Sequence, residues 1–111
     1  MQNQPARISA DEAQGFDIPT PEAGRAEARK RLRHMFRPGE LIWLLSERYN
    51  SAAGAWDIDI LRQGAAGRWV RQRYRFDTQD EVLYFLGESS LTDDQFREAR
   101  RSGRLFPSAD A

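Results

Sequence analysis

The sequence lacks cysteine altogether, which excludes disulfide bonds, zinc sites built on thiolates and cysteine nucleophiles. It also lacks any apolar run near the ~20 residues that a membrane-spanning helix needs. The N-terminus shows no basic segment followed by an apolar one, so we expect no signal peptide. We therefore interpret the chain as a small bacterial protein of the cytoplasm that makes no membrane contact.

Histidine is nearly absent as well. The only one, His34, lies in an arginine-rich stretch without the second histidine or the cysteine that a metal or catalytic site would need. We interpret it as a surface or helix-capping residue. The chain also has no glycine-rich phosphate loop and no G-x-S-x-G nucleophile motif. We predict that the protein is not an enzyme and has no catalytic residues, no metal site and no cofactor.

Lysine is equally scarce, because Lys30 is the only one and arginine carries the remaining positive charge. The net charge of the chain is zero, but the charges are unevenly placed. Residues 1–20 sum to −2 (one basic and three acidic), and residues 21–106 sum to +3 (16 basic and 13 acidic). Two explanations of the arginine content stay open. One is a GC-rich coding sequence, and the other is recognition of phosphate or carboxylate groups by the planar guanidinium.

The stretch from Trp56 to Phe76 alternates between charged and uncharged residues in both of its halves. Such alternation is typical of β-strands, and the glycines between the halves predict an antiparallel hairpin. A one-residue slip would turn every side chain to the wrong face, so we expect an odd loop of about three or five residues. In the register that follows, the cross-strand pairs are Ile60 with Val70, Trp56 with Tyr74, Asp59 with Arg71, and Asp57 with Arg73.

A helix is predicted from Thr20 to about Phe36. Its start has a hydroxyl cap, a proline in the first turn and an acidic residue near the positive end of the helix dipole. Pro38-Gly39 ends it. Water, an acidic partner or a phosphate backbone could face the basic stripe of this helix. The stripe consists of Arg25, Arg29, Arg33 and Arg37, which recur every four residues.

The segment Glu40–Tyr49 is compatible with a helix or with a buried strand, because Leu41–Leu45 is a nearly continuous apolar run. A strand is favoured, since Asn50–Gly54 then becomes a hairpin loop that leads into Trp56. With the hairpin that follows, the segment would complete a three-stranded antiparallel meander.

Two capping boxes predict two further helices after the meander. The box Thr78–Glu81 precedes an apolar run, so we predict a helix that ends at Gly87 and covers the apolar face of the sheet. The box Thr92–Gln95 predicts another helix, which ends at Gly103. The apolar side of the first of these helices consists of Val82, Leu83, Phe85 and Leu86.

The predicted fold class is therefore α+β, with an N-terminal helix, a three-stranded antiparallel meander and two C-terminal helices, in the order αβββαα. A hydrophobic fraction of 40% is enough for one modest core. We expect residues 20–106 to form a single domain, with a flexible tail at residues 1–19 and a frayed C-terminus at residues 107–111.

This order of elements resembles known nucleic-acid-binding domains over roughly residues 40–87. Three strands and a capped helix are similar to the DNA-binding domains of plant ethylene-response factors and to phage integrase arm-binding domains, and Arg73–Glu81 resembles their strand-to-helix junction. With the first helix added, the order αβββα resembles double-stranded-RNA-binding domains. Those typically start their last helix with a basic cluster, where this chain has the acidic Thr78–Glu81. A shared fold alone does not imply a shared function.

Asp57 and Asp59 project from one face of the second predicted strand, where two carboxylates could hold a divalent cation. The same face carries Arg71, Arg73 and Arg75, which would neutralise the carboxylates. We therefore interpret these residues as cross-strand ion pairs, each worth about 0.2–1 kcal/mol.

Binding is the function that the sequence favours. Trp69 is predicted on the charged face of the sheet, either exposed as a recognition residue or covered by the first helix or the tail. The leading hypothesis is a small non-enzymatic binding or regulatory protein that contacts a protein partner or a second copy of itself. The alternative is a nucleic-acid-binding module that uses the arginine-rich third strand and the basic first helix. The candidate partner-binding residues are Trp69, Arg68, Arg71, Arg73, Arg75, Arg25, Arg29 and Arg33.

Overall fold

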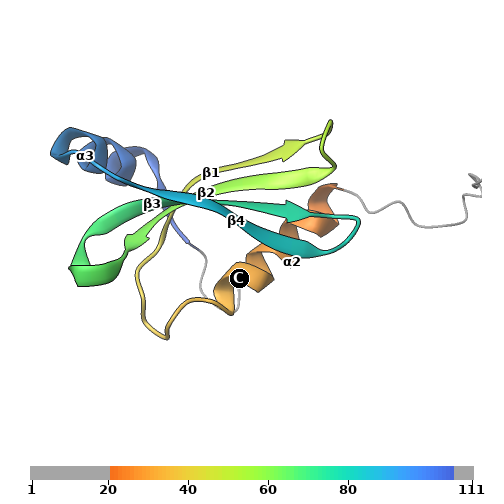
Figure 1. The fold of residues 1–111 in the computed structure, drawn as a ribbon, viewed down its shortest axis with the longest axis horizontal. Coiled ribbons are helices and arrows are strands. Elements are labelled where there is room, and N and C mark those ends of the chain that lie inside the picture. Colours follow the sequence, from red (N-terminus) through yellow and green to blue (C-terminus); the bar gives the residue numbers. More distant parts are fainter. Residues whose placement is uncertain (1–20, 107–111) are drawn as a thin grey trace, which may run out of the picture.

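The computed structural model describes residues 21–106, which form a five-stranded antiparallel sheet with one helix on each face (Figure 1). The strand order across the sheet is β4-β3-β2-β1-β5. The tail predicted at residues 1–19 and the frayed end predicted at residues 107–111 lie outside the described residues. In chain order the elements are α2 (Pro21–Arg33), β1 (Trp43–Asn50), β2 (Ala55–Gln63), the short 3-10 helix η1 (Ala65–Gly67), β3 (Trp69–Asp77), β4 (Val82–Ser90), α3 (Asp93–Ser102) and β5 (Arg104–Leu105).

The predicted order αβββαα is wrong, because Val82–Ser90 forms a fourth strand, β4, and not a helix. The box Thr78–Glu81 forms the turn between β3 and β4 instead. The Asp77 carboxylate accepts hydrogen bonds from the backbone N–H groups of Gln79 and Asp80, both at 2.9 Å, which builds an Asx turn. The β-branched and aromatic residues that follow pair with β3. The resemblance to a strand-to-helix junction therefore does not hold.

Thr78 shows why this box does not cap a helix. Its hydroxyl donates to the carbonyl of Gly54 at 2.8 Å, and its backbone N–H donates to the same carbonyl at 3.1 Å. The side chain thus joins the β3–β4 turn to the β1–β2 turn. Glu81 has a φ of 57°, and this left-handed conformation interrupts a helix at the third position after Thr78.

The box Thr92–Gln95 behaves as predicted. The Thr92 hydroxyl accepts a hydrogen bond from the Gln95 backbone N–H at 3.2 Å, and the Gln95 side chain accepts one from the Thr92 backbone N–H at 2.9 Å. The helix α3 that follows ends before Gly103, as the sequence indicated. The strand prediction for Glu40–Tyr49 is confirmed by β1, and the first helix, α2, ends at Arg33, a little before the predicted end.

The β2–β3 hairpin has the predicted odd loop, with five residues between Gln63 and Trp69. The predicted faces are therefore correct, but the predicted pairs are shifted by two residues. Loops of three and five residues keep the same side chains on the same face, so alternation alone does not distinguish them. The longer loop is closed by η1 and by a 2.7 Å hydrogen bond from the Gly64 N–H to the Arg68 carbonyl. The observed pairs include Trp56 and Phe76, Asp57 and Arg75, Ile58 and Tyr74, Asp59 and Arg73, and Leu61 and Arg71.

The main core lies between α2 and the sheet. Ala28 and Leu32 of α2 are fully buried against the apolar face of β2 and β3. Gly24 allows this close approach, since a Cβ atom there would lie 3.3 Å from Nε1 of Trp56 and 2.6 Å from a methyl group of Thr78. The cluster consists of Ala28, Leu32, Ile42, Leu44, Trp56, Ile58, Ile60, Tyr74, Phe76 and Phe106.

The opposite face of the sheet is only partly covered. Figure 1 shows α3 at the other end of the molecule from α2 and on the other side of the sheet. Below it, Leu61 is fully buried on the same face as Trp43, with which it pairs across β1 and β2. Within residues 21–106, neither helix is long and apolar enough to cross a membrane.

Candidate functional site

A ladder of charged side chains occupies the part of this second face that α3 leaves open. Nε and Nη2 of Arg71 donate to Oδ2 of Asp59 at 3.1 and 2.5 Å, and Nε of Arg73 donates to Oδ1 of the same carboxylate at 3.3 Å. Arg75 forms a two-pronged pair with Asp57, with N–O distances of 2.7 and 3.2 Å. The strands bring these groups together because facing residues of an antiparallel pair share one side of the sheet.

The electrostatics of the ladder follow from this geometry. Hydrogen bonds from Arg75 hold the pKa of Asp57 below its usual value, with Asn50 and Arg48 contributing less, and Asp57 in turn raises the pKa of Arg75. Asp59 is buried although it is charged, which its two arginine partners make possible. The interpretation of the aspartates as ion-pair partners is confirmed.

Trp69 is not the exposed residue that a recognition surface would present. Its ring is half-buried and makes an edge-to-face contact with Trp43 at a centroid distance of 5.8 Å. The ring of Phe96 lies 5.7 Å away. Among the described residues the covering element is therefore α3 and not the first helix, whereas the tail that was the other predicted cover lies outside the described residues.

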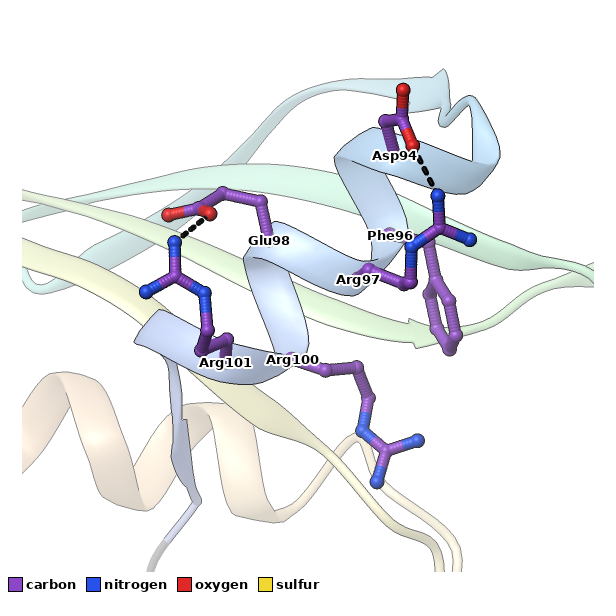
Figure 2. Close-up of a pocket in the computed structure, with 6 residues that line it drawn as sticks. All are labelled: Asp94, Phe96, Arg97, Glu98, Arg100 and Arg101. Carbon is purple, nitrogen blue, oxygen red and sulfur yellow. Dashed lines mark hydrogen bonds and ion pairs between the residues drawn. The ribbon is translucent and has the colours of Figure 1, made fainter.

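Figure 2 shows the side chains of α3, two of which make this cover. Phe96 and Arg100 extend from the helix on the side that reaches the two tryptophans, and the Arg100 guanidinium lies 4.5 Å from the ring centroid of Trp43. Arg97 and Arg101 instead form ion pairs with acidic residues of the same helix, Asp94 and Glu98.

The three predicted arginines of α2 lie on the other side of the sheet from the ladder. Arg29 donates from Nε and Nη2 to the two oxygens of Glu47, both at 2.7 Å, and these bonds raise its pKa. Arg25 pairs with Glu22 and lies 5.9 Å from the ring centroid of Trp56. Two of the four arginines of the predicted basic stripe are therefore engaged within the protein.

Arg33 and Arg68 complete the predicted set. Arg33 lines a cavity of about 480 Å³ at the C-terminal end of α2, beside Phe36 and Phe106. Arg68 is exposed in the β2–β3 loop. The eight predicted residues therefore lie in several separate places, with only Arg71, Arg73 and Arg75 forming a contiguous cluster. Within residues 21–106, no group of three or more histidine, aspartate or glutamate side chains is arranged to hold a metal ion.

The feature that the sequence did not reveal is the free edge of β4. This strand has nine residues and, within residues 21–106, pairs with β3 only, so its other side ends the described sheet. Tyr84, Phe85 and Leu86 are exposed, and 56% of the Phe85 surface is accessible. The strand contains no lysine, arginine or proline, the residues that commonly protect an edge from pairing with another chain.

A β-bulge divides this edge into two parts. Tyr74 pairs with Phe85 and Arg73 with Gly87, which leaves Leu86 as the extra residue. Gly87 has a φ of 153°, a conformation that glycine adopts readily. The part before the bulge is apolar, and the part after it, Glu88–Ser90, is polar. The β-branched and aromatic run Val82–Phe85 was the sequence signal that could have identified a strand.

Comparisons of this chain with models of protein families, with curated proteins and with solved structures found no match.

Proposed function

We propose that the protein is a small, non-enzymatic binding protein that acts through protein–protein contacts and uses the free edge of β4 as its docking strand. The observation that carries the proposal is this nine-residue edge, which is exposed and which is apolar and uncharged before its bulge. An extended segment of a partner can add to such an edge as a further strand.

The edge offers both affinity and selectivity. Its unpaired backbone N–H and C=O groups would form a ladder with the added strand, which supplies affinity for any extended segment. Tyr84 lies on the face of the arginine ladder, and Leu83 and Phe85 lie on the face of α2. A partner strand with apolar residues at alternate positions would therefore contact both sets.

The arginine ladder lies one strand away from this edge. Arg73 is the most open of its three arginines, with 57% of the side chain exposed, and Arg75 is paired with Tyr84 across β3 and β4. Both guanidinium groups have N–H donors beyond those used for Asp57 and Asp59. A partner segment that carries carboxylates beside its apolar residues would suit this surface best.

Selection of displayed random peptides against the purified chain, followed by amide NMR mapping, tests the proposal. We expect selected peptides to shift the amide signals of β3 and β4, and Phe85→Lys to weaken their binding at least about tenfold because it places a charge on the edge. Leu105→Lys is the matched control, since Leu105 is exposed to 58% on the opposite edge. Its binding should equal that of the unaltered chain.

Peptides that shift only signals remote from β4 would contradict the proposal. Binding of random-sequence duplex or single-stranded nucleic acid, with an affinity that falls steeply as salt rises, would also contradict the proposal. The nucleic-acid alternative predicts that result. In that case Arg68→Ala should weaken binding and Phe85→Lys should not.

A further inference from the structure

The two edges of the sheet offer very different opportunities for pairing. At one end, β5 has two residues, and at the other, β4 has nine. Only β4 is long enough to hold another strand over several residues. We propose that the strand it holds is β4 of a second copy of this chain, paired antiparallel around a two-fold axis at Tyr84. This inference rests on the proposed function, since it names the partner for the same edge.

Self-pairing of β4 meets no electrostatic obstacle over its apolar part. Val82–Gly87 contains no charged residue, so two copies can meet there without a like-charge contact. Like charges directly opposite each other are the usual means by which an edge strand rejects its own copy.

Symmetry restricts the register. Two identical antiparallel strands related by a two-fold axis place one residue opposite its own copy, and opposite residues share a face of the sheet. An axis at Tyr84 keeps the central pairs before the bulge, brings Val82 opposite the bulge residue Leu86, and makes every opposed pair apolar or aromatic. Besides the two copies of Tyr84, the pairs are Leu83 with Phe85 of the second copy and Val82 with Leu86 of the second copy.

The ends of the pairing segment limit its strength. In this register Asp80, in the turn before β4, lies near Glu88 of the second copy, at both ends of the joined strands. The contact is short, so we expect a weak dimer with a micromolar dissociation constant that is populated at high protein concentration. Because the acidic ends repel each other, association should strengthen as salt rises, the opposite of phosphate-dominated binding.

The absence of native cysteine makes a direct test simple. Opposite Cα atoms in an antiparallel pair are ~4.5–5.5 Å apart, within the ~4.4–6.8 Å range of disulfides. We expect Tyr84→Cys to form disulfide-linked dimers rapidly under mild oxidation. Leu105→Cys, somewhat more exposed on the other edge, should remain monomeric under the same conditions. Equal cross-linking of the two variants would overturn the inference.

A charge exchange tests the two-fold axis itself. Tyr84→Lys and Tyr84→Glu should each weaken dimerisation at least about tenfold, because each places like charges opposite one another. A mixture of the two should restore a heterodimer, as measured by sedimentation equilibrium. Circular dichroism and thermal melting check that both variants are folded.

The outcomes separate this inference from the proposed function. A chain that stays monomeric at every concentration, and still binds selected peptides at β4, overturns self-pairing and leaves the proposed function intact. A dimer that neither charged variant disrupts overturns the β4 axis. A monomer whose selected peptides also avoid β4 overturns both.

Discussion

The two edges of the sheet differ in length, charge and anchoring. The edge at β5 is short, begins with Arg104 and is followed by Phe106, whose N–H donates to the Ile42 carbonyl at 2.7 Å. The edge at β4 is long, and a bulge divides it into an apolar part and the polar part Glu88–Ser90. Two residues leave little backbone for another chain to pair with, whereas nine leave a full template. Within the described residues, one edge is therefore tied to the core and the other leaves its backbone groups unpaired.

Of the expected effects, the largest is the difference in unfolding free energy between two phenylalanine-to-alanine substitutions, one beside each edge. Phe106 is buried in the core and packs edge-to-face with Phe36 at 5.5 Å, whereas Phe85 is largely exposed and contacts Tyr74. We expect Phe106→Ala to lower the free energy of unfolding by about 3 kcal/mol through the lost burial and the cavity left behind. Phe85→Ala should lower it by about 1 kcal/mol or less. Urea denaturation measures both, and equal losses would contradict the comparison.

Replacing either of two glycines near the edges by alanine should destabilise the protein, but for different physical reasons. A Cβ atom at Gly103, before β5, would lie 2.8 Å from the Ala99 carbonyl oxygen and 2.9 Å from a methyl group of Leu45. We expect Gly103→Ala to destabilise the protein by about 1–3 kcal/mol through overpacking. At Gly87 there is open space, so Gly87→Ala should cost about 1 kcal/mol through its φ of 153° alone. Thermal melts would rank the two, and the reverse order would count against this account.

Loss of the Asx cap should destabilise the turn that joins β3 to β4. Asp77→Ala removes the acceptor of the Gln79 and Asp80 N–H groups, and we expect a loss of about 1 kcal/mol. Hydrogen exchange should accelerate in β4 more than in β1, since only β4 depends directly on this turn. Asp80→Ala is the control, because its side chain is exposed in the same turn. Uniform acceleration over all strands would argue against local attachment.

The smallest expected effect is the acid response of the ladder beside β4. The folded-state pKa of Asp57 is lowered by Arg75, so the pair stabilises the protein above the unfolded pKa of ~3.9. This stabilisation is lost as the pH falls through the lower, folded-state pKa. Because the pair is partly exposed, we expect less than about 1 kcal/mol. Asp57→Asn should reduce the slope of unfolding free energy against pH in this acidic window, and an unchanged slope would contradict the expected effect.

Several elements could be predicted because their signals are local. The alternation from Trp56 to Phe76 correctly assigned the strands, their faces and an odd loop. The shift of two residues in the pairs could not be found this way, since it changes no face. The candidate site was predicted only in part. The Asp–Arg ladder follows from alternation, but the cover of Trp69 depends on where Phe96 of α3 packs, far along the chain.

The two capping boxes show most clearly what the sequence alone determined and what the tertiary structure decided. In the box Thr92–Gln95 the side chains of Thr92 and Gln95 each bond to the other residue's backbone N–H, so local hydrogen bonds and the helix dipole suffice to start α3. Thr78–Glu81 has the same pattern, but the Thr78 hydroxyl bonds to Gly54 and Val82–Ser90 pairs with β3. The ladder of backbone hydrogen bonds with a neighbouring strand outweighs a cap worth about 1 kcal/mol. Local chemistry thus determined the helix ends and the strand faces. That β4 is a strand with an open edge was decided only by the assembled sheet, because β3 still had an unpaired side with which Val82–Ser90 could pair.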